Sequence, residues 1–132
     1  MADTYSGSER RRFKRVPAKF LVTCKASNVA EALILFNNKK IDALMFDLSE
    51  GGMAIVTNDG IPIGTRLSIE FTLINDRAFN DSDKFRTLSE IKGEIRNDNL
   101  LDKNQHRLGI QFDSINRRDK LAIANFVKAT II

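Results

Sequence analysis

The most regular stretch of the sequence is Arg66-Leu67-Ser68-Ile69-Glu70-Phe71-Thr72-Leu73, in which apolar and polar side chains alternate without a break. Successive side chains of a β-strand point to opposite faces of its sheet, so this pattern predicts a strand with one buried and one solvated face. The predicted core positions are Leu67, Ile69, Phe71 and Leu73. No other segment indicates a half-buried strand as clearly.

Shorter stretches with strand character lie on both sides of this segment. Strands are predicted at residues 20–25, 32–36, 41–46, 53–57, 88–95 and 107–112. Turn or loop signals separate them at residues 37–40, 47–52, 58–64, 75–86 and 97–104. Because these connections are too short for crossover helices, the sequence predicts an antiparallel barrel or sandwich.

The apolar spacing changes near the C-terminus. Leu121 and Val127 belong to a set of apolar residues at close to helical spacing, and either Asn116 or Ser114 is available as the N-cap. The sequence therefore predicts one amphipathic helix, at about residues 116–130, that packs on the β-structure. The expected fold class is all-β with a C-terminal helix.

Composition favours a single small domain that does not insert into a membrane. With 132 residues, 42% of them hydrophobic, the chain can bury one core of ordinary size. Its longest apolar run, residues 32–36, is far shorter than the roughly 20 residues of a membrane span. The N-terminus lacks the apolar segment of a secretory signal, and the lone Cys24 cannot form an internal disulfide. We therefore expect a cytoplasmic protein.

The positive charge is concentrated at the N-terminus. Of the 21 basic and 17 acidic residues, residues 1–20 hold six and two, which leaves 15 of each kind in residues 21–132. The whole net charge of +4 thus belongs to one short stretch, which suggests an arm that captures an anion. Residues before Arg10 are polar and without periodicity, so they are expected to be disordered until something holds them.

Catalytic and metal-binding patterns are missing from the sequence. His106 and Cys24 are the only histidine and cysteine, so a His/Cys metal cluster is impossible. The sequence has no glycine-rich phosphate loop opening a helix and no pair of carboxylates spaced for acid–base work. We expect no enzymatic activity, no catalytic residue, no metal and no cofactor.

Two segments carry residues suited to binding. The first is Arg10-Arg11-Arg12-Phe13-Lys14-Arg15. A guanidinium group can grip phosphate oxygens or the O6/N7 edge of guanine with two hydrogen bonds, and it can stack on a purine. The second is Asp47-Leu48-Ser49-Glu50-Gly51-Gly52, which offers a carboxylate, a hydroxyl and a backbone that a ligand can approach closely. Taken alone, the first can equally be a solvated arm or a nucleic-acid patch, and the second a tight turn with local hydrogen bonds.

Together and in this order, the two segments resemble the two motifs of the PilZ family of cyclic di-GMP receptors. Arg11 and Arg15 match the Arg-xxx-Arg motif of that family. Asp47, Ser49 and Gly52 match its second motif, Asp/Asn-x-Ser-x-x-Gly. The resemblance covers about residues 9–128, nearly the whole chain, and it implies a six-stranded antiparallel PilZ-type β-barrel with a C-terminal helix.

The resemblance also implies a division of the chain and a ligand. The expected parts are a flexible tail (1–8) and a PilZ domain (9–132), the latter with an arm (10–15), a barrel (about 16–113) and the helix (about 116–130). The expected ligand is cyclic di-GMP, and its expected binding residues are Arg10, Arg11, Arg15, Asp47, Ser49 and Gly52. The arginines would bind phosphates and stack on purine faces, and Asp47 would accept hydrogen bonds from guanine N–H groups or instead orient an arginine. Ser49 would add a polar contact, and Gly52, which has no side chain, would leave space for the ligand. Arg10 adds a further guanidinium group to the Arg11–Arg15 pair and could serve a second stacked ligand, so the number of ligand molecules, one or two, stays open.

The expected output is a signal to a protein partner. Ligand binding would order the arginine arm, and a downstream partner would recognise the ordered surface. Two alternatives stay open: a module that binds nucleic acid through the basic arm, and a PilZ-like adaptor that works without ligand. The first is disfavoured because residues 21–132 are neutral, Tyr5 is the only tyrosine and tryptophan is absent. A nucleic-acid polymer is therefore not an expected partner.

Overall fold

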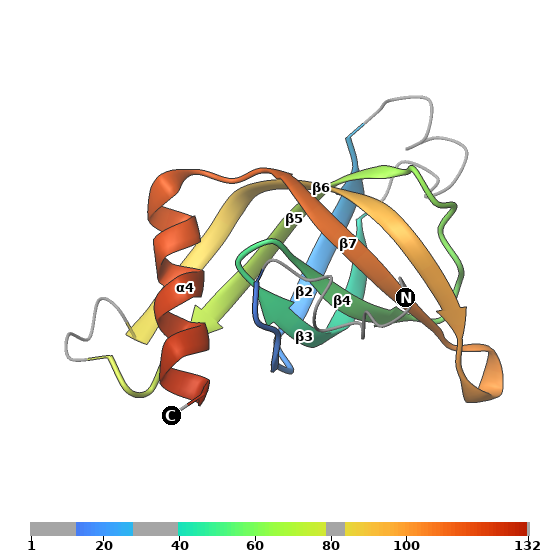
Figure 1. Cartoon of the computed structure of the whole chain (residues 1–132). Coiled ribbons are helices and arrows are strands. Elements are labelled where there is room, and N and C mark those ends of the chain that lie inside the picture. Colours follow the sequence, from blue (N-terminus) through green and yellow to red (C-terminus); the bar gives the residue numbers. More distant parts are fainter. Residues whose placement is uncertain (1–12, 28–39, 79–83, 132) are drawn as a thin grey trace, which may run out of the picture.

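A closed, six-stranded antiparallel β-barrel forms the body of the protein, with a short extra strand and a C-terminal helix (Figure 1). The computed structural model describes residues 13–27, 40–78 and 84–131. The elements are β1 (Val16–Pro17), β2 (Leu21–Ala26), β3 (Ile41–Ser49), β4 (Gly52–Thr57), β5 (Arg66–Ile74), β6 (Phe85–Leu100), the 3-10 helix η2 (Asp102–Asn104), β7 (His106–Ser114) and α4 (Arg117–Ile131). The barrel runs in the order β3-β2-β5-β6-β7-β4 and closes where β4 pairs with β3, while β1 pairs with the other edge of β3. The expected fold class is confirmed.

The barrel interior is filled by alternating residues of the strands. Leu67, Ile69, Phe71 and Leu73 of β5 are all buried, as the alternating pattern predicted. Cys24 of β2 belongs to the same core, where burial, with a smaller contribution from the nearby Asp42 carboxylate, raises the pKa of its thiol to about 12. The thiol therefore stays protonated and packs as a small apolar side chain.

Helix α4 covers one end of the barrel (Figure 1). Its buried side chains include Ile123 and Val127, and the ring of Phe126 lies 5.5 Å from that of Phe20. Of the two N-cap candidates, Asn116 and Ser114, it is Asn116 whose Oδ1 accepts a 2.8 Å hydrogen bond from the backbone N–H of Asp119. The helix start thus follows the sequence pattern, but its buried face does so only in part: Val127 is buried as expected, whereas Leu121 is exposed and Ile123 takes the central buried position.

Three predicted boundaries were wrong, in each case because polar residues were assigned to a turn. β3 continues through Asp47 to Ser49, where the backbone pairs with β4 and β1. β6 begins at Phe85 and continues to Leu100, so residues 85–86 and 97–100 are paired strand. Polar residues are tolerated there because their side chains lie on the outside of the barrel, in ion pairs or, for the buried Ser49, in hydrogen bonds with the following turn. The expected strand at 32–36 and most of the turn at 37–40 lie outside the described residues.

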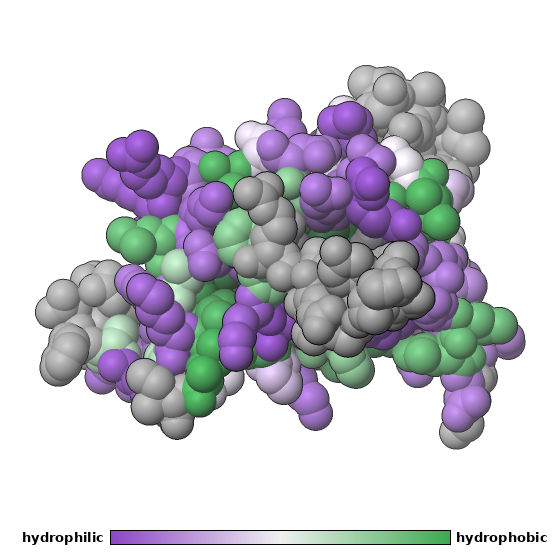
Figure 2. Space-filling view, in the orientation of Figure 1, coloured by the Kyte–Doolittle hydropathy of each residue, from purple (hydrophilic) through white to green (hydrophobic). Residues whose placement is uncertain are grey.

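The face of the molecule shown in Figure 2 is mostly hydrophilic. On the face shown in Figure 2, apolar side chains form small separate groups between polar ones. Within the described ranges, no helix is long and apolar enough to cross a membrane.

Candidate functional site

Strand β1 brings Arg15 to the side of Asp47. β1 pairs with β3 in the register Val16–Leu48 and Pro17–Asp47, so the residue just before β1 lies beside the last part of β3. Arg15 Nη1 donates a 3.0 Å hydrogen bond to Asp47 Oδ1. One residue from each sequence motif is thus in direct contact. Arg10 and Arg11 lie outside the described residues.

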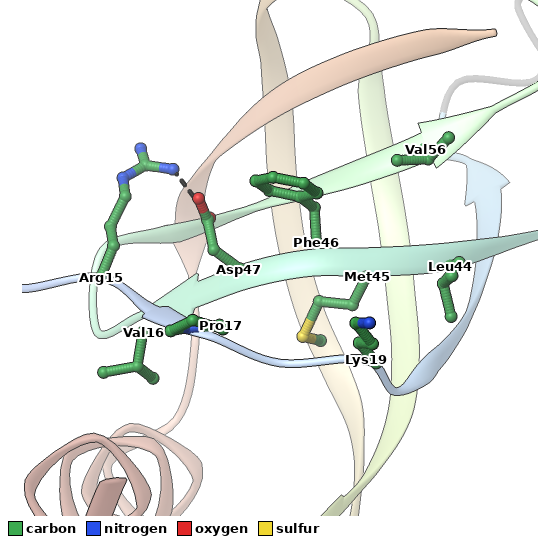
Figure 3. Close-up of a pocket in the computed structure, with 9 residues that line it drawn as sticks. All are labelled: Arg15, Val16, Pro17, Lys19, Leu44, Met45, Phe46, Asp47 and Val56. Atoms are coloured by element: carbon green, nitrogen blue, oxygen red, sulfur yellow. Dashed lines mark hydrogen bonds and ion pairs between the residues drawn. The ribbon is translucent and has the colours of Figure 1, made fainter. Parts of the chain in front are cut away.

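A β-bulge in β3 puts Asp47 on the outer face of the barrel. The pairing of β3 with β4 shifts between Met45 and Asp47, which leaves Phe46 as an extra residue. Met45 is fully buried in the core, whereas about half of Phe46 is exposed. Figure 3 shows Phe46 and Asp47 on the side of β3 opposite to Met45. The bulge therefore gives one aromatic ring and one carboxylate to the same outer surface.

A second arginine, absent from both sequence motifs, holds the other oxygen of Asp47. Arg107 Nη2 on β7 donates a 3.2 Å hydrogen bond to Asp47 Oδ2. The guanidinium carbon of Arg107 lies 4.7 Å from the centroid of the Phe46 ring. The backbone N–H of Ala54 donates to Asp47 Oδ1 at 3.2 Å. One carboxylate, only 8% exposed as a residue, thus orients two guanidinium groups.

Ser49 and the following glycines form the turn from β3 to β4. The buried Ser49 Oγ accepts a hydrogen bond from the Gly51 N–H (3.2 Å) and donates one to the Gly52 carbonyl oxygen (3.3 Å). A Cβ atom at Gly52 would lie 2.1 Å from the carbonyl oxygen of Ile110 on β7. The bare Cα of Gly52 is therefore needed for the close approach of β4 and β7. Ligand contacts of Ser49 and Gly52 stay predictions.

Phe13 links this turn to the helix. Its ring lies against Gly51, where a Cβ atom would be 2.7 Å from Phe13 Cδ2. The ammonium nitrogen of Lys120, in the first turn of α4, lies 5.5 Å from the centroid of the same ring. Phe13 thus packs between the β3–β4 turn and the start of α4.

A pocket of about 360 Å³ opens beside the Arg15–Asp47 ion pair (Figure 3). Its walls are mostly apolar and come from the segment around β1 and from strands β3 and β4. Arg15, Lys19 and Asp47 contribute the charged groups that line it. Arg15 and Arg107 both pair with Asp47, and Lys19 adds a third cation to the lining of the pocket. An apolar pocket with few, convergent polar groups and excess positive charge suits a planar, anionic ligand.

The described residues contain no group of three or more histidine, cysteine or acidic side chains that could hold a metal ion. His106 begins β7, and its Nδ1 lies 2.8 Å from Asp98 Oδ1.

A family model for the PilZ domain matches residues 9–129. The chain belongs to the PilZ family. No curated protein sequence matches the chain.

Solved structures share the fold of this PilZ domain at low sequence identity. The Bacillus subtilis inhibitor of motility MotI/DgrA is 18% identical, with a TM-score of 0.69 over 92% of this chain and 52% of that one. The PilZ domain of Escherichia coli YcgR, solved with c-di-GMP, is 16% identical, with a TM-score of 0.58 over 92% of both chains. The complex of K. pneumonia MrkH with c-di-GMP is 17% identical, with a TM-score of 0.62 over 92% of this chain and 52% of that one. The chain thus spans about half the length of MotI and MrkH.

Sequence reasoning found Arg15 and Asp47 but missed Arg107 and Lys19. Arg107 lies 60 residues from Asp47 in the sequence, and only the pairing of β4 with both β3 and β7 brings the two together. A faint signal was available, since Arg107 occupies the first outward position of a predicted strand. Nothing in the sequence linked that position to the arginine arm.

Proposed function

We propose that this PilZ domain is a cyclic di-GMP receptor. The observation that carries the proposal is the Asp47 carboxylate shared by Arg15 and Arg107 at the edge of an apolar pocket. This site lies where the two family motifs meet in the fold. The PilZ domain of YcgR, which has the same fold, was solved with c-di-GMP.

The charge of the site supports a dianionic ligand. Arg15, Lys19 and Arg107 outnumber Asp47 by two charges, and cyclic di-GMP carries two phosphates. Arg10 and Arg11 would add further guanidinium groups from the arm. We assign Arg15 to phosphate, because its guanidinium lies beside the pocket and its remaining N–H groups are available for charge-assisted hydrogen bonds.

The second motif supplies the floor of the proposed site. Asp47 orients arginines, Ser49 fixes the turn, and Gly52 lets β7 approach β4. We propose that guanine lies against this turn, with Ser49 and Gly52 within reach of the ligand. Because three donors already occupy its carboxylate, Asp47 acts mainly through the arginines that it orients.

We further propose that ligand binding orders the arm in front of Phe13. Phe13 packs against Gly51, and Val16–Pro17 pair with β3, so the described part of the arm is attached to the barrel at two places. Neutralisation of Arg10 and Arg11 by the ligand would fix the residues before this anchor. The fixed arm would then present a surface to a protein partner.

Isothermal titration of the full chain with cyclic di-GMP tests the receptor function, and a single-stranded oligonucleotide serves as the competing ligand. We expect saturable binding of the cyclic dinucleotide, with a stoichiometry that distinguishes one ligand molecule from two. Binding of the oligonucleotide alone, with a steep salt dependence, would favour a nucleic-acid module instead. Binding of neither would favour the ligand-independent adaptor.

A further inference from the structure

The side chain of Arg107 is more restrained than that of an ordinary surface arginine such as Arg66. Its guanidinium is fixed from two directions, by the hydrogen bond from Nη2 to Asp47 Oδ2 and by the face of the Phe46 ring. Its side chain is 27% exposed, compared with 62% for Arg66, which pairs with Asp113 and Glu94 on the outer surface. A planar fork held in this way has already lost most of the freedom that binding would otherwise remove.

The fork of Arg107 is also incompletely satisfied. Its Nε is buried and has no hydrogen-bond partner, the one such side-chain nitrogen or oxygen among the described residues. An unpaired buried donor costs free energy, so a native structure keeps one only where something else favours the arrangement. Here the arrangement keeps the guanidinium beside Asp47 and on the outer face of the barrel.

The neighbouring carboxylate is poorly placed to recognise a base itself. Asp47 Oδ1 accepts from Arg15 and from the Ala54 N–H, and Oδ2 accepts from Arg107. A guanine that used Asp47 for its N–H groups would have to compete with three existing donors. The two arginines, by contrast, each donate to that carboxylate through one nitrogen and are about a quarter exposed as side chains.

We propose that Arg107 is the specificity-determining residue of the site, with its guanidinium donating to the O6 and N7 acceptors of a guanine. An arginine that donates two hydrogen bonds to this edge is the commonest base-specific contact in protein–DNA complexes. Adenine presents an amino donor where guanine presents O6, so the same fork discriminates against adenine. Phe46 and Asp47 are positioning residues in this proposal, which rests on the proposed receptor function.

Titrations of the full chain with cyclic di-GMP and cyclic di-AMP test the proposal, using wild type, Arg107→Lys and the control Arg66→Lys. Lysine keeps the charge but loses the fork. We expect Arg107→Lys to reduce the preference for the guanine dinucleotide by about tenfold or more, since one bidentate contact is worth roughly that discrimination. Arg66→Lys, on the outer surface of β5, should keep the wild-type ratio.

Phe46→Leu provides a second variant, because it removes the aromatic support at a half-exposed position without touching a charge. We expect it to reduce the preference in the same direction but by less, about threefold. Unchanged preference in both variants, or a parallel loss of affinity for both dinucleotides, would overturn the role of Arg107. A wild type that binds neither dinucleotide would instead overturn the receptor function, and this inference with it.

Discussion

Two buried aspartates, Asp47 and Asp119, have similar surroundings, but we assign them different roles, one at the proposed binding site and one in the structure. Asp47 is 8% exposed and Asp119 is 4% exposed, and each accepts a 3.0 Å hydrogen bond from an arginine. The partner of Asp119 is Arg86 on β6, and its other carboxylate oxygen accepts from Asn116 Nδ2 at 3.0 Å. The network around Asp119 joins the start of α4 to the barrel and is complete within the fold.

The region around Asp47 holds more positive charges than its one carboxylate can neutralise. Arg15 and Arg107 share one carboxylate, Lys19 lies at the same pocket, and Arg107 Nε is unpaired. Burial and an arginine partner are therefore common to a structural carboxylate and to one at a proposed binding site. The feature that separates them is excess cationic capacity beside an open pocket.

The largest expected effect comes from removing the arginine partner of each aspartate, Arg15 for Asp47 and Arg86 for Asp119. Arg15→Ala should weaken binding of cyclic di-GMP by about 2–5 kcal/mol, the range for removing one partner of a desolvated charge pair, with little change in the free energy of unfolding. Arg86→Ala should do the reverse, because Arg86 contacts Asp119 and not the pocket. Titration calorimetry and urea denaturation of both variants measure the two quantities. Equal affinity in wild type and Arg15→Ala would contradict the assignment of the site.

A second prediction concerns the carboxylates themselves. Asp119→Ala should lower the free energy of unfolding by about 2 kcal/mol, because it removes charged hydrogen bonds from Arg86 and Asn116 at the helix start. Asp47→Ala should lower the free energy of unfolding less, because only Asp119 also places a negative charge in the first turn of α4, where it favours the helix N-terminus. The exposed Asp113 serves as the control, and its alanine variant should be nearly neutral. A larger stability loss for Asp47 than for Asp119 would remove the distinction between the two sites.

The sequence predicted the parts of these two regions that depend on local patterns. Alternation gave the core face of β5, helical spacing and Asn116 gave α4, and the motif order placed Arg15 with Asp47. Contacts created by barrel closure were not predictable in this way. Arg107 meets Asp47 only because β4 pairs with both β3 and β7, and Arg86 meets Asp119 only because α4 folds back on the barrel.

The sequence also misjudged where β3 ends, and for a physical reason. A run of polar residues and glycines is typical of a turn, so a break was expected from Asp47 onward. The strand continues because two arginines satisfy the Asp47 carboxylate and Ser49 bonds to the turn that follows it. The one-residue bulge at Phe46, which gives the site its outer face, left no separate signal in the sequence.

A smaller effect is expected at Ser49, where the two kinds of role meet. Its hydroxyl holds the β3–β4 turn through Gly51 and Gly52, so Ser49→Ala should cost about 1 kcal/mol of stability. If Ser49 also contacts the ligand, affinity should fall as well, by less than in Arg15→Ala. Ser68→Ala on the half-buried face of β5 is a matched control. A loss of stability with unchanged affinity would make Ser49 a purely structural residue.

The smallest expected effect tests whether the two regions communicate. The Phe13 side chain contacts both the turn beside Asp47, through Gly51, and the residue after Asp119, through Lys120. If ligand binding fixes the arm, the ring of Phe13 should be held more firmly. Amide hydrogen exchange in the first turn of α4 should then slow about two- to fivefold, because a partly exposed cation–π contact contributes little free energy. Phe13→Leu should abolish this response while α4 itself stays folded on the barrel through Ile123 and Val127. Phe85→Leu, at an exposed phenylalanine on β6, is the control and should respond as wild type. Equal exchange in α4 with and without cyclic di-GMP would show that the site and the helix start are independent, and that any signal to a partner leaves through the arm alone.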